Sequence, residues 1–186
     1  MGLKPARTAL VAGLLLCVGL FFSAAPALGA AAEEIDAKVD ASLKEFRKKV
    51  GPADELLQNA RGVLVFPSVI KAGLGVGGEF GEGALRIGGE TVDYYNTVAA
   101  SIGFQLGAQS KTIILLFMTE EALSDFRSSK GWEVGVDGSV ALVTIGAGGS
   151  LDTHTLQQPI IGFVFNNKGL MYNLTLEGSK ITRIEK

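Results

Sequence analysis

The sequence predicts an α+β domain: a large, strongly bent, mostly antiparallel β-sheet with an N-terminal amphipathic helix and one further helix packed on it. Two observations predict this class. Hydrophobic residues recur at helical spacing over residues 33–50, and from Gly62 onward the apolar period changes from about 3.6 to about 2. Glycine is also frequent, at 25 of 186 residues, and many glycines interrupt strand-like segments. A sheet that bends on itself accounts for them.

Residues 1–30 have the composition of a secretory signal peptide. Lys4 and Arg7 precede an apolar run over residues 9–22, and small residues around Pro26 follow. The apolar run is shorter than the roughly 20 residues that span a bilayer. We therefore expect an exported protein that is located in the periplasm or is peripheral to the outer membrane.

The charge balance excludes a nucleic-acid binder that relies on bulk positive charge. The chain has 17 Lys and Arg against 19 Asp and Glu, a net charge of −2, and residues 1–30 hold two of the cations and none of the acids. The mature chain is therefore mildly acidic. Cys17 is the only cysteine and lies within the predicted signal, so the mature domain is expected to be stable without disulfides.

Residues 33–50 predict the amphipathic helix. Acidic residues occupy its early turns and basic residues its late turns, as the helix dipole favours, and Gly51-Pro52 ends it. A shorter helix over residues 53–60 is expected next. The apolar side chains recur every three or four residues and form one stripe: Ile35, Val39, Leu43, Phe46 and Val50. We divide the mature chain into this helix, residues 31–51, and a β-rich domain, residues 52–186.

Strands are predicted from residue 62, with one helix between two groups of them. Gly88-Gly89 has the sequence of a hairpin turn, and Pro67 indicates an edge or a bulge. Thr119 is the expected N-cap of the helix and Lys130-Gly131 its end. A turn is expected at residues 166–169. The predicted strands cover residues 62–70, 73–81, 84–87, 91–95, 98–106, 112–118, 134–136, 139–146, 160–165, 170–176 and 180–184.

Catalytic and metal chemistry find little support. Residues 73–78 contain G-x-G-x-x-G, but a hairpin-like sequence follows where a dinucleotide site needs a helix. The glycines at 146–150 favour a bend over an anion-binding nest. His154 is the only histidine and lies in a predicted polar loop, and Glu79 and Glu82 are expected at a solvated surface. We expect no catalytic residue, no metal and no cofactor, and hence no enzyme.

The basic end of the first helix has two interpretations. Cations that flank an apolar stripe can bury their stems in a lipid interface while their charges meet phosphates. Alternatively the helix docks on the sheet with its outer face in water, which the pattern alone favours. Three or four cations at roughly 1 kcal/mol each give only about millimolar affinity. Lipid binding would therefore also need apolar insertion or a head-group pocket.

Four stretches, in this order, resemble the SYLF lipid-binding domain family: ARGVLVFP (60–67), VIKAG (69–73), GFQLGAQ (103–109) and KGLMYNLTLEGS (168–179). The resemblance covers residues 52–186 and implies binding to anionic lipid head groups, with an amphipathic N-terminal helix engaging the bilayer. By position, the helix 33–50 corresponds to that element and Lys71 to the lysine of the family's Lys-Ala-Gly motif. We carry over phospholipid binding but not actin regulation, because we expect an exported protein to meet no actin.

The sequence thus predicts a non-enzymatic phospholipid-binding protein of the cell envelope. Its expected partner is anionic phospholipid or a membrane surface, and not nucleic acid. The alternative is a protein-interaction or scaffolding module whose exposed strand edges, near Pro67, recruit a partner chain. The expected lipid-binding residues are the helix cations, one aromatic residue of the stripe and the lysine of the sheet: Lys38, Lys44, Phe46, Arg47, Lys48, Lys49 and Lys71.

Overall fold

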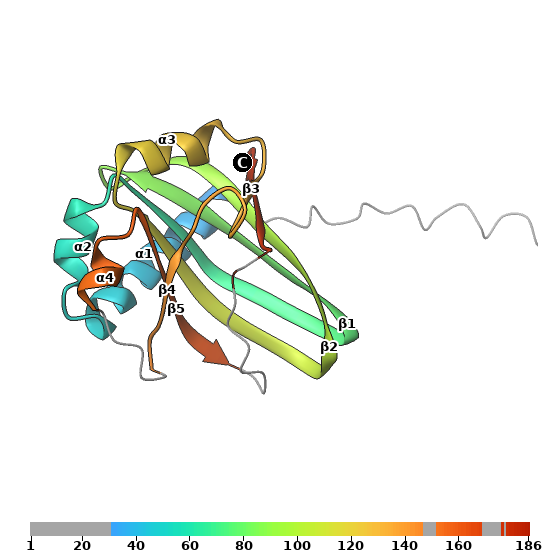
Figure 1. Ribbon diagram of the computed structural model, residues 1–186. Coiled ribbons are helices and arrows are strands. Elements are labelled where there is room, and N and C mark those ends of the chain that lie inside the picture. Colours follow the sequence, from blue (N-terminus) through green and yellow to red (C-terminus); the bar gives the residue numbers. More distant parts are fainter. Residues whose placement is uncertain (1–30, 147–151, 169–175, 177) are drawn as a thin grey trace, which may run out of the picture.

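Two long strands dominate the computed structural model, which describes residues 31–146, 152–168, 176 and 178–186, with only the backbone of 74–76 and 101–107 (Figure 1). The predicted α+β class and bent sheet are confirmed. The predicted signal peptide and most of the strand predicted at 170–176 lie outside the described residues. In chain order the elements are α1 (Ala32–Lys49), α2 (Ala53–Asn59), β1 (Gly62–Ile87), β2 (Glu90–Phe117), α3 (Glu120–Ser128), β3 (Trp132–Glu133), β4 (Ala141–Thr144), α4 (Thr153–Leu156), β5 (Ile160–Lys168) and β6 (Lys180–Ile184).

Strands β1 and β2 form one antiparallel ribbon that folds back on itself (Figure 1). The turn between them is Gly88-Gly89, with positive φ angles of 61° and 91°, as the sequence predicts. The register shifts between Phe66 and Val69, where Pro67 lies, and again between Leu74 and Gly75. The sequence predicts six shorter strands here because glycines interrupt the pattern, whereas the backbone continues through them as two.

The sheet has six strands in the order β3-β6-β2-β5-β4, with β1 also paired to β2. All pairs are antiparallel except β4 with β5, which are parallel. Three local predictions are wrong. The strand expected at 134–136 lies earlier, as β3 at Trp132–Glu133. Residues 166–168 of the expected turn 166–169 are instead the end of β5, where Asn166 has a φ of 57°, and residue 169 lies outside the described residues. The polar loop expected at His154 is the short helix α4.

The sheet has a hydrophobic core on each face. Helices α1 and α2 cover the outer face, where Phe46 packs against Phe163 and Phe165 at ring-centroid distances of 4.8 and 6.3 Å. Helix α3 closes the inner, concave face, where Phe126 lies 4.8 Å from Phe117 and 5.6 Å from Trp132. The helices thus protect the part of the ribbon that is nearest to them.

The two legs of the folded ribbon approach so closely that glycine is required between them. A Cβ atom on Gly83 would lie 2.0 Å from the carbonyl oxygen of Val65, and one on Gly81 would lie 2.8 Å from Cγ2 of Val69. These contacts show that the inner faces of the two legs press against each other. Part of the glycine content therefore serves the fold, as predicted.

Candidate functional site

The apolar stripe of α1 is packed against the sheet. Ile35, Val39 and Phe46 are at most 2% exposed, and Phe46 is 0% exposed between two phenylalanines of β5. The prediction that Phe46 and its stripe enter a lipid interface is therefore wrong for this structure. The physical reason is that the sheet supplies an apolar surface for the helix, and the sequence of the helix alone cannot show this.

Two of the predicted helix cations are paired along the helix itself. Lys38 forms an ion pair with Glu34 one turn earlier, and Lys49 forms one with Glu45 at 3.3 Å. The Lys49 ammonium also lies 5.9 Å from the centre of the Phe165 ring, within cation–π range. The charges of these two lysines are therefore engaged in contacts within α1 and between α1 and β5, and are less available to a ligand.

Glu45 connects the outer surface of α1 to the end of β5. Asn166 donates a hydrogen bond from Nδ2 to Oε2 of Glu45 at 2.6 Å. This bond, with Lys49 nearby, lowers the pKa of Glu45 below its usual value of 4.5. The carboxylate is therefore stabilised in its charged form.

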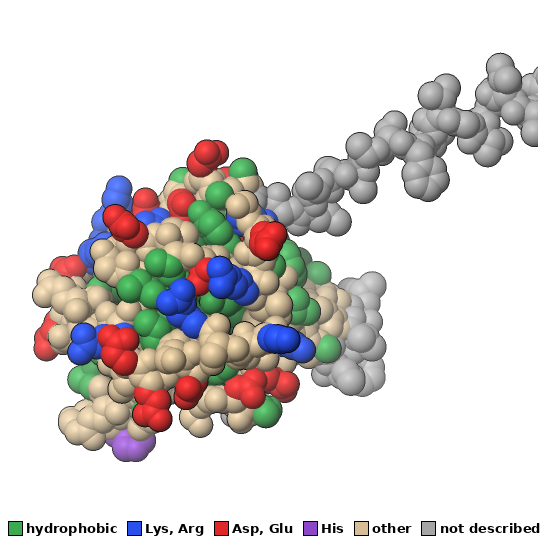
Figure 2. Space-filling view, turned by 90° about the horizontal axis from the view of Figure 1, so that it is seen from above, with side chains coloured by type: hydrophobic (Ala, Val, Ile, Leu, Met, Phe, Trp, Pro, Cys, Tyr) green, Lys and Arg blue, Asp and Glu red, His purple; other side chains and the backbone are tan. Residues whose placement is uncertain are grey.

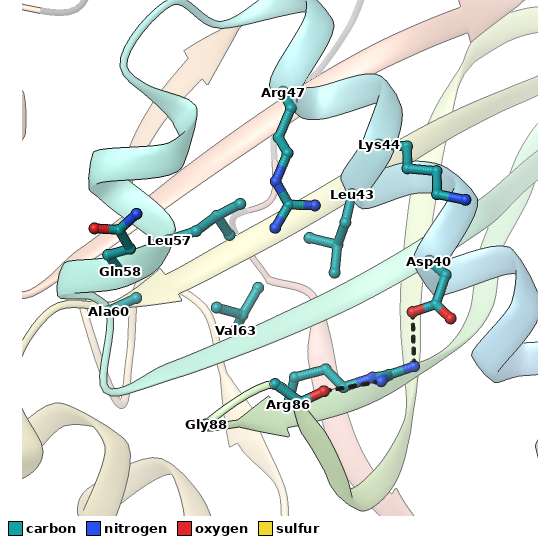
Figure 3. A pocket seen from close by; sticks show the side chains of 11 residues that line it. Asp40, Leu43, Lys44, Arg47, Leu57, Gln58, Ala60, Val63, Arg86 and Gly88 are labelled. Atoms are coloured by element: carbon teal, nitrogen blue, oxygen red, sulfur yellow. Dashed lines mark hydrogen bonds and ion pairs between the residues drawn. The ribbon is translucent and has the colours of Figure 1, made fainter.

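A pocket of about 480 Å³ opens between α1, α2 and the β1–β2 turn (Figure 3). We call it the α1–α2 pocket. Its walls combine three cations with an apolar floor, which is the combination that an anionic amphiphile needs. The lining residues are Asp40, Leu43, Lys44, Arg47, Leu57, Gln58, Ala60, Val63, Arg86, Gly88 and Gly89.

Arg86 is a fixed wall of this pocket. Its guanidinium donates to Asp40 at 3.0 Å, to Asp36 at 3.4 Å and to the carbonyl oxygen of Gly89 at 3.0 Å. Asp36 also accepts hydrogen bonds from Thr91 and from the Tyr94 hydroxyl, at 2.7 and 2.9 Å. Burial, followed by the bond to Asp36, raises the pKa of Tyr94. Because its partners are acids of α1, Arg86 holds the helix against the ribbon.

Arg47 and Lys44 are the cations that a ligand could reach. Arg47 extends from α1 into the pocket between Leu43 and Leu57 (Figure 3). Its ion pair is with Asp54 at 2.9 Å, and that side chain is 73% exposed. Exposed ion pairs contribute about 0–1 kcal/mol, so a phosphate could replace Asp54 at little cost. Lys44 has no ion pair or hydrogen bond with any residue that the structure describes.

Lys48 and Lys71, the remaining predicted cations, lie away from this pocket. Lys48 is exposed on α1. Lys71 lies on β1 two residues after Val69, which belongs to the inner core, so its side chain is on the face opposite to α1. Lys71 is only 8% exposed. The structure therefore does not join Lys71 and the cations of α1 into one site.

The face seen from above carries mixed charge (Figure 2). Seen from above, basic side chains in the middle of the face are surrounded by acidic ones (Figure 2). None of the helices in the described part of the chain has the length and apolar character that a bilayer crossing requires. Within the same residues, no three His, Cys, Asp or Glu side chains are grouped to hold a metal ion.

Comparison with known families supports the resemblance found in the sequence. Residues 98–186, which begin in the first third of β2 and run to Lys186, match the family model Ysc84, described as Las17-binding protein actin regulator. The SYLF resemblance is confirmed over these residues. The SYLF family is linked to lipid binding and to actin regulation. No curated protein matches this chain.

The α1–α2 pocket joins residues that sequence reasoning treated separately. Lys44 and Arg47 were predicted as lipid-binding residues, whereas Arg86, Leu57 and Val63 were not. Helical spacing explains the first pair, because residues three apart share a face. The others come from α2 and from both ends of β1, and no local pattern places them beside α1.

Proposed function

We propose that this protein is a non-enzymatic, exported SYLF protein that binds anionic phospholipid through the α1–α2 pocket. The observation that carries the proposal is an open pocket whose apolar floor lies beside two accessible cations, Lys44 and Arg47. A phosphate head group would contact these cations. The adjoining apolar part of the lipid would contact Leu43, Leu57 and Val63.

The expected binding free energies favour recognition by a pocket over attraction to a charged surface. Two or three cations at about 1 kcal/mol each near an anionic membrane give only weak binding. Burying the first few methylene groups of a lipid adds about 0.8 kcal/mol per group. Because the mature chain is acidic overall, attraction by net charge does not assist. Local geometry must supply the affinity.

Sedimentation with liposomes tests this proposal. The full chain is mixed with phosphatidylcholine vesicles that contain or lack phosphatidylglycerol. The double variant Lys44→Gln/Arg47→Gln should bind the anionic vesicles about thirtyfold more weakly. The matched control, Lys38→Gln/Lys49→Gln, removes the same charge from the same helix but outside the pocket, and should bind nearly as the wild type does.

Two results would contradict the proposal. Equal binding to neutral and anionic vesicles would exclude recognition of anionic lipid. An equal loss in the two double variants would show that only the total charge of α1 matters and that the pocket does not contribute.

A second candidate function is a protein-interaction module. Within the described residues, β1 pairs only with β2, so its other edge has no partner strand. Pro67 and the register shifts weaken this edge as a template, since both are features that discourage strand addition. Recovery from an envelope extract of one stoichiometric partner, unaffected by detergent, would favour this function. Capture that detergent abolishes would count against it.

A further inference from the structure

The bend of the folded ribbon lies at the end that is farthest from α2 and α4 (Figure 1). At this end charged side chains are buried and apolar ones are exposed. We call residues 69–80 of β1 and 98–111 of β2, which pair with each other, the distal segment. Its charged residues are Lys71, Glu79 and Lys111, and all three are buried, at 8%, 6% and 3% exposure. In a water-soluble sheet these groups would face the solvent.

The buried polar groups lie between the two legs of the ribbon. Lys111 Nζ contacts Glu79 Oε1 at 2.7 Å, which joins one leg to the other. Gln109, 3% exposed, donates to Asn167 on β5, and Lys71 pairs with Gln109 across the ribbon. Paired residues of antiparallel strands have side chains on the same face, so Lys71 also points inward. Lys71 has no ion pair with any residue that the structure describes, and it is Lys111 that engages Glu79.

The outward positions of the distal segment carry the apolar side chains. Ile70 is 54% exposed, and the cross-strand neighbours Phe80 and Val98 are 46% and 47% exposed. Ala72, Ala100 and Ala108 are exposed as well. Among the positions whose side chains the structure describes, the outer face here is free of charge.

We infer that the distal segment is a wedge that enters the apolar boundary of a lipid bilayer. The apolar residues occupy both outer surfaces, with Ile70 on one leg and Phe80 on the other. A docked protein would cover one surface, whereas lipid surrounds an inserted wedge on both. The buried lysines and Glu79 remain between the legs, shielded from the lipid.

The dimensions of the segment set how it enters the boundary. Ile70, Phe80 and Val98 each lie five residues from the bend at Gly75 and its partner Gly103, about 16 Å at about 3.3 Å per residue. Interfacial elements enter the head-group and acyl boundary by about 5–10 Å. The ribbon must therefore lie obliquely in the boundary for these three side chains to be buried. The wedge thus supplies the apolar insertion that α1, docked on the sheet, does not.

This inference rests on the proposed lipid binding and is tested separately from it. An environment-sensitive fluorophore is attached at Val98→Cys in a Cys17→Ser background, with Val136→Cys as the control. Val136 is 74% exposed and lies outside the distal segment. With phosphatidylglycerol-containing vesicles, the probe at 98 should shift to shorter wavelength and gain intensity, whereas the probe at 136 should not change.

A binding measurement supplements the fluorescence. Phe80→Ser/Val98→Ser should reduce sedimentation with vesicles about tenfold while preserving the preference for anionic lipid. The control, Val136→Ser/Leu156→Ser, removes two exposed apolar side chains elsewhere and should bind as the wild type does. Equal melting temperatures establish that both variants fold.

The outcomes separate the two proposals. Vesicle binding without a shift at position 98 would overturn the wedge and leave the pocket standing. A shift at 98 that grows with protein concentration in the absence of vesicles would also overturn the wedge, and would indicate a second copy of the chain on that surface. Failure of the wild type to bind any vesicle would overturn both proposals.

Discussion

The two ends of the β1–β2 ribbon differ in which side chains they bury: apolar ones near the helices and charged ones in the distal segment. Near the helices, Leu64 and Leu85 point into the inner hydrophobic core and are 0% exposed, while α1 and α2 cover the opposite face. In the distal segment, lysines are buried and Phe80 and Val98 face outward. The same two strands thus serve stability at one end and are suited to an apolar environment at the other. We therefore seek the function of the ribbon in the distal segment, where charged side chains are buried and apolar side chains are exposed.

The largest effect that tests this comparison is the removal of one aromatic ring from each end. Phe46→Ala should lower the free energy of unfolding by about 3–5 kcal/mol, because it leaves a cavity beside Phe163 and Phe165. Phe80→Ala should change it by less than about 0.5 kcal/mol, since that ring is half exposed. Chemical denaturation measures both. Similar losses would mean that the distal segment is part of the core.

A second contrast concerns glycine. Gly83→Ala should destabilise the protein by about 1–3 kcal/mol, because the added Cβ would lie 2.0 Å from a backbone oxygen that cannot move aside. Gly78→Ala should be nearly neutral, since its closest neighbour would be 4.0 Å away. Thermal unfolding of the two variants checks this. A neutral Gly83→Ala would show that the legs are less tightly pressed than described.

Replacing Lys71, one of the two buried lysines of the distal segment, is predicted to stabilise the folded protein. Lys71→Met should raise the free energy of unfolding in the absence of lipid by about 1 kcal/mol, because it replaces a buried ammonium with an apolar side chain of similar length. Denaturant titration of the variant and the wild type measures the change. Loss of stability would show that the Lys71 ammonium makes a favourable interaction in the folded protein.

The smallest effect concerns the Asn166 to Glu45 bond at the covered end. The folded-state pKa of Glu45 is lowered, so its contribution is present above the unfolded-state pKa and is lost as the pH falls through the folded-state value. Asn166→Ala should cost under about 1 kcal/mol at pH 7. This cost should diminish as the pH falls below the usual glutamate pKa of 4.5 and through the lower folded-state pKa. In a Glu45→Gln background it should not vary over that pH range.

The sequence predicts the fold better than the site. Helical spacing places α1 within one residue at each end, and Thr119 caps α3 by accepting from the amide of Ala122, as expected. These are local patterns. By contrast, the burial of Phe46 depends on β5, more than 110 residues later, and the continuity of β1 and β2 depends on pairing across the ribbon. Local periodicity does not report such contacts.

In the candidate site, too, the sequence predicts the residues placed by a local pattern and misses those placed by contacts distant in the chain. Lys44 and Arg47 are found by their place on a helix, but Arg86 enters the pocket only because the β1–β2 turn folds beneath α1. Lys71 is predicted beside the helix cations through the family motif, yet strand alternation places it on the opposite face. The sequence does not predict that Phe80 and Val98 are exposed, since apolar residues in strands are expected to be buried.

Hydrogen–deuterium exchange of the full chain, with and without phosphatidylglycerol vesicles, tests the central claim most directly. The account predicts added protection over residues 69–80 and 98–111 on vesicle binding, and unchanged slow exchange across α1, which stays docked on the sheet. Loss of protection along α1, with no change in the distal segment, would contradict it, because that result would mean that the helix leaves the sheet to enter the bilayer.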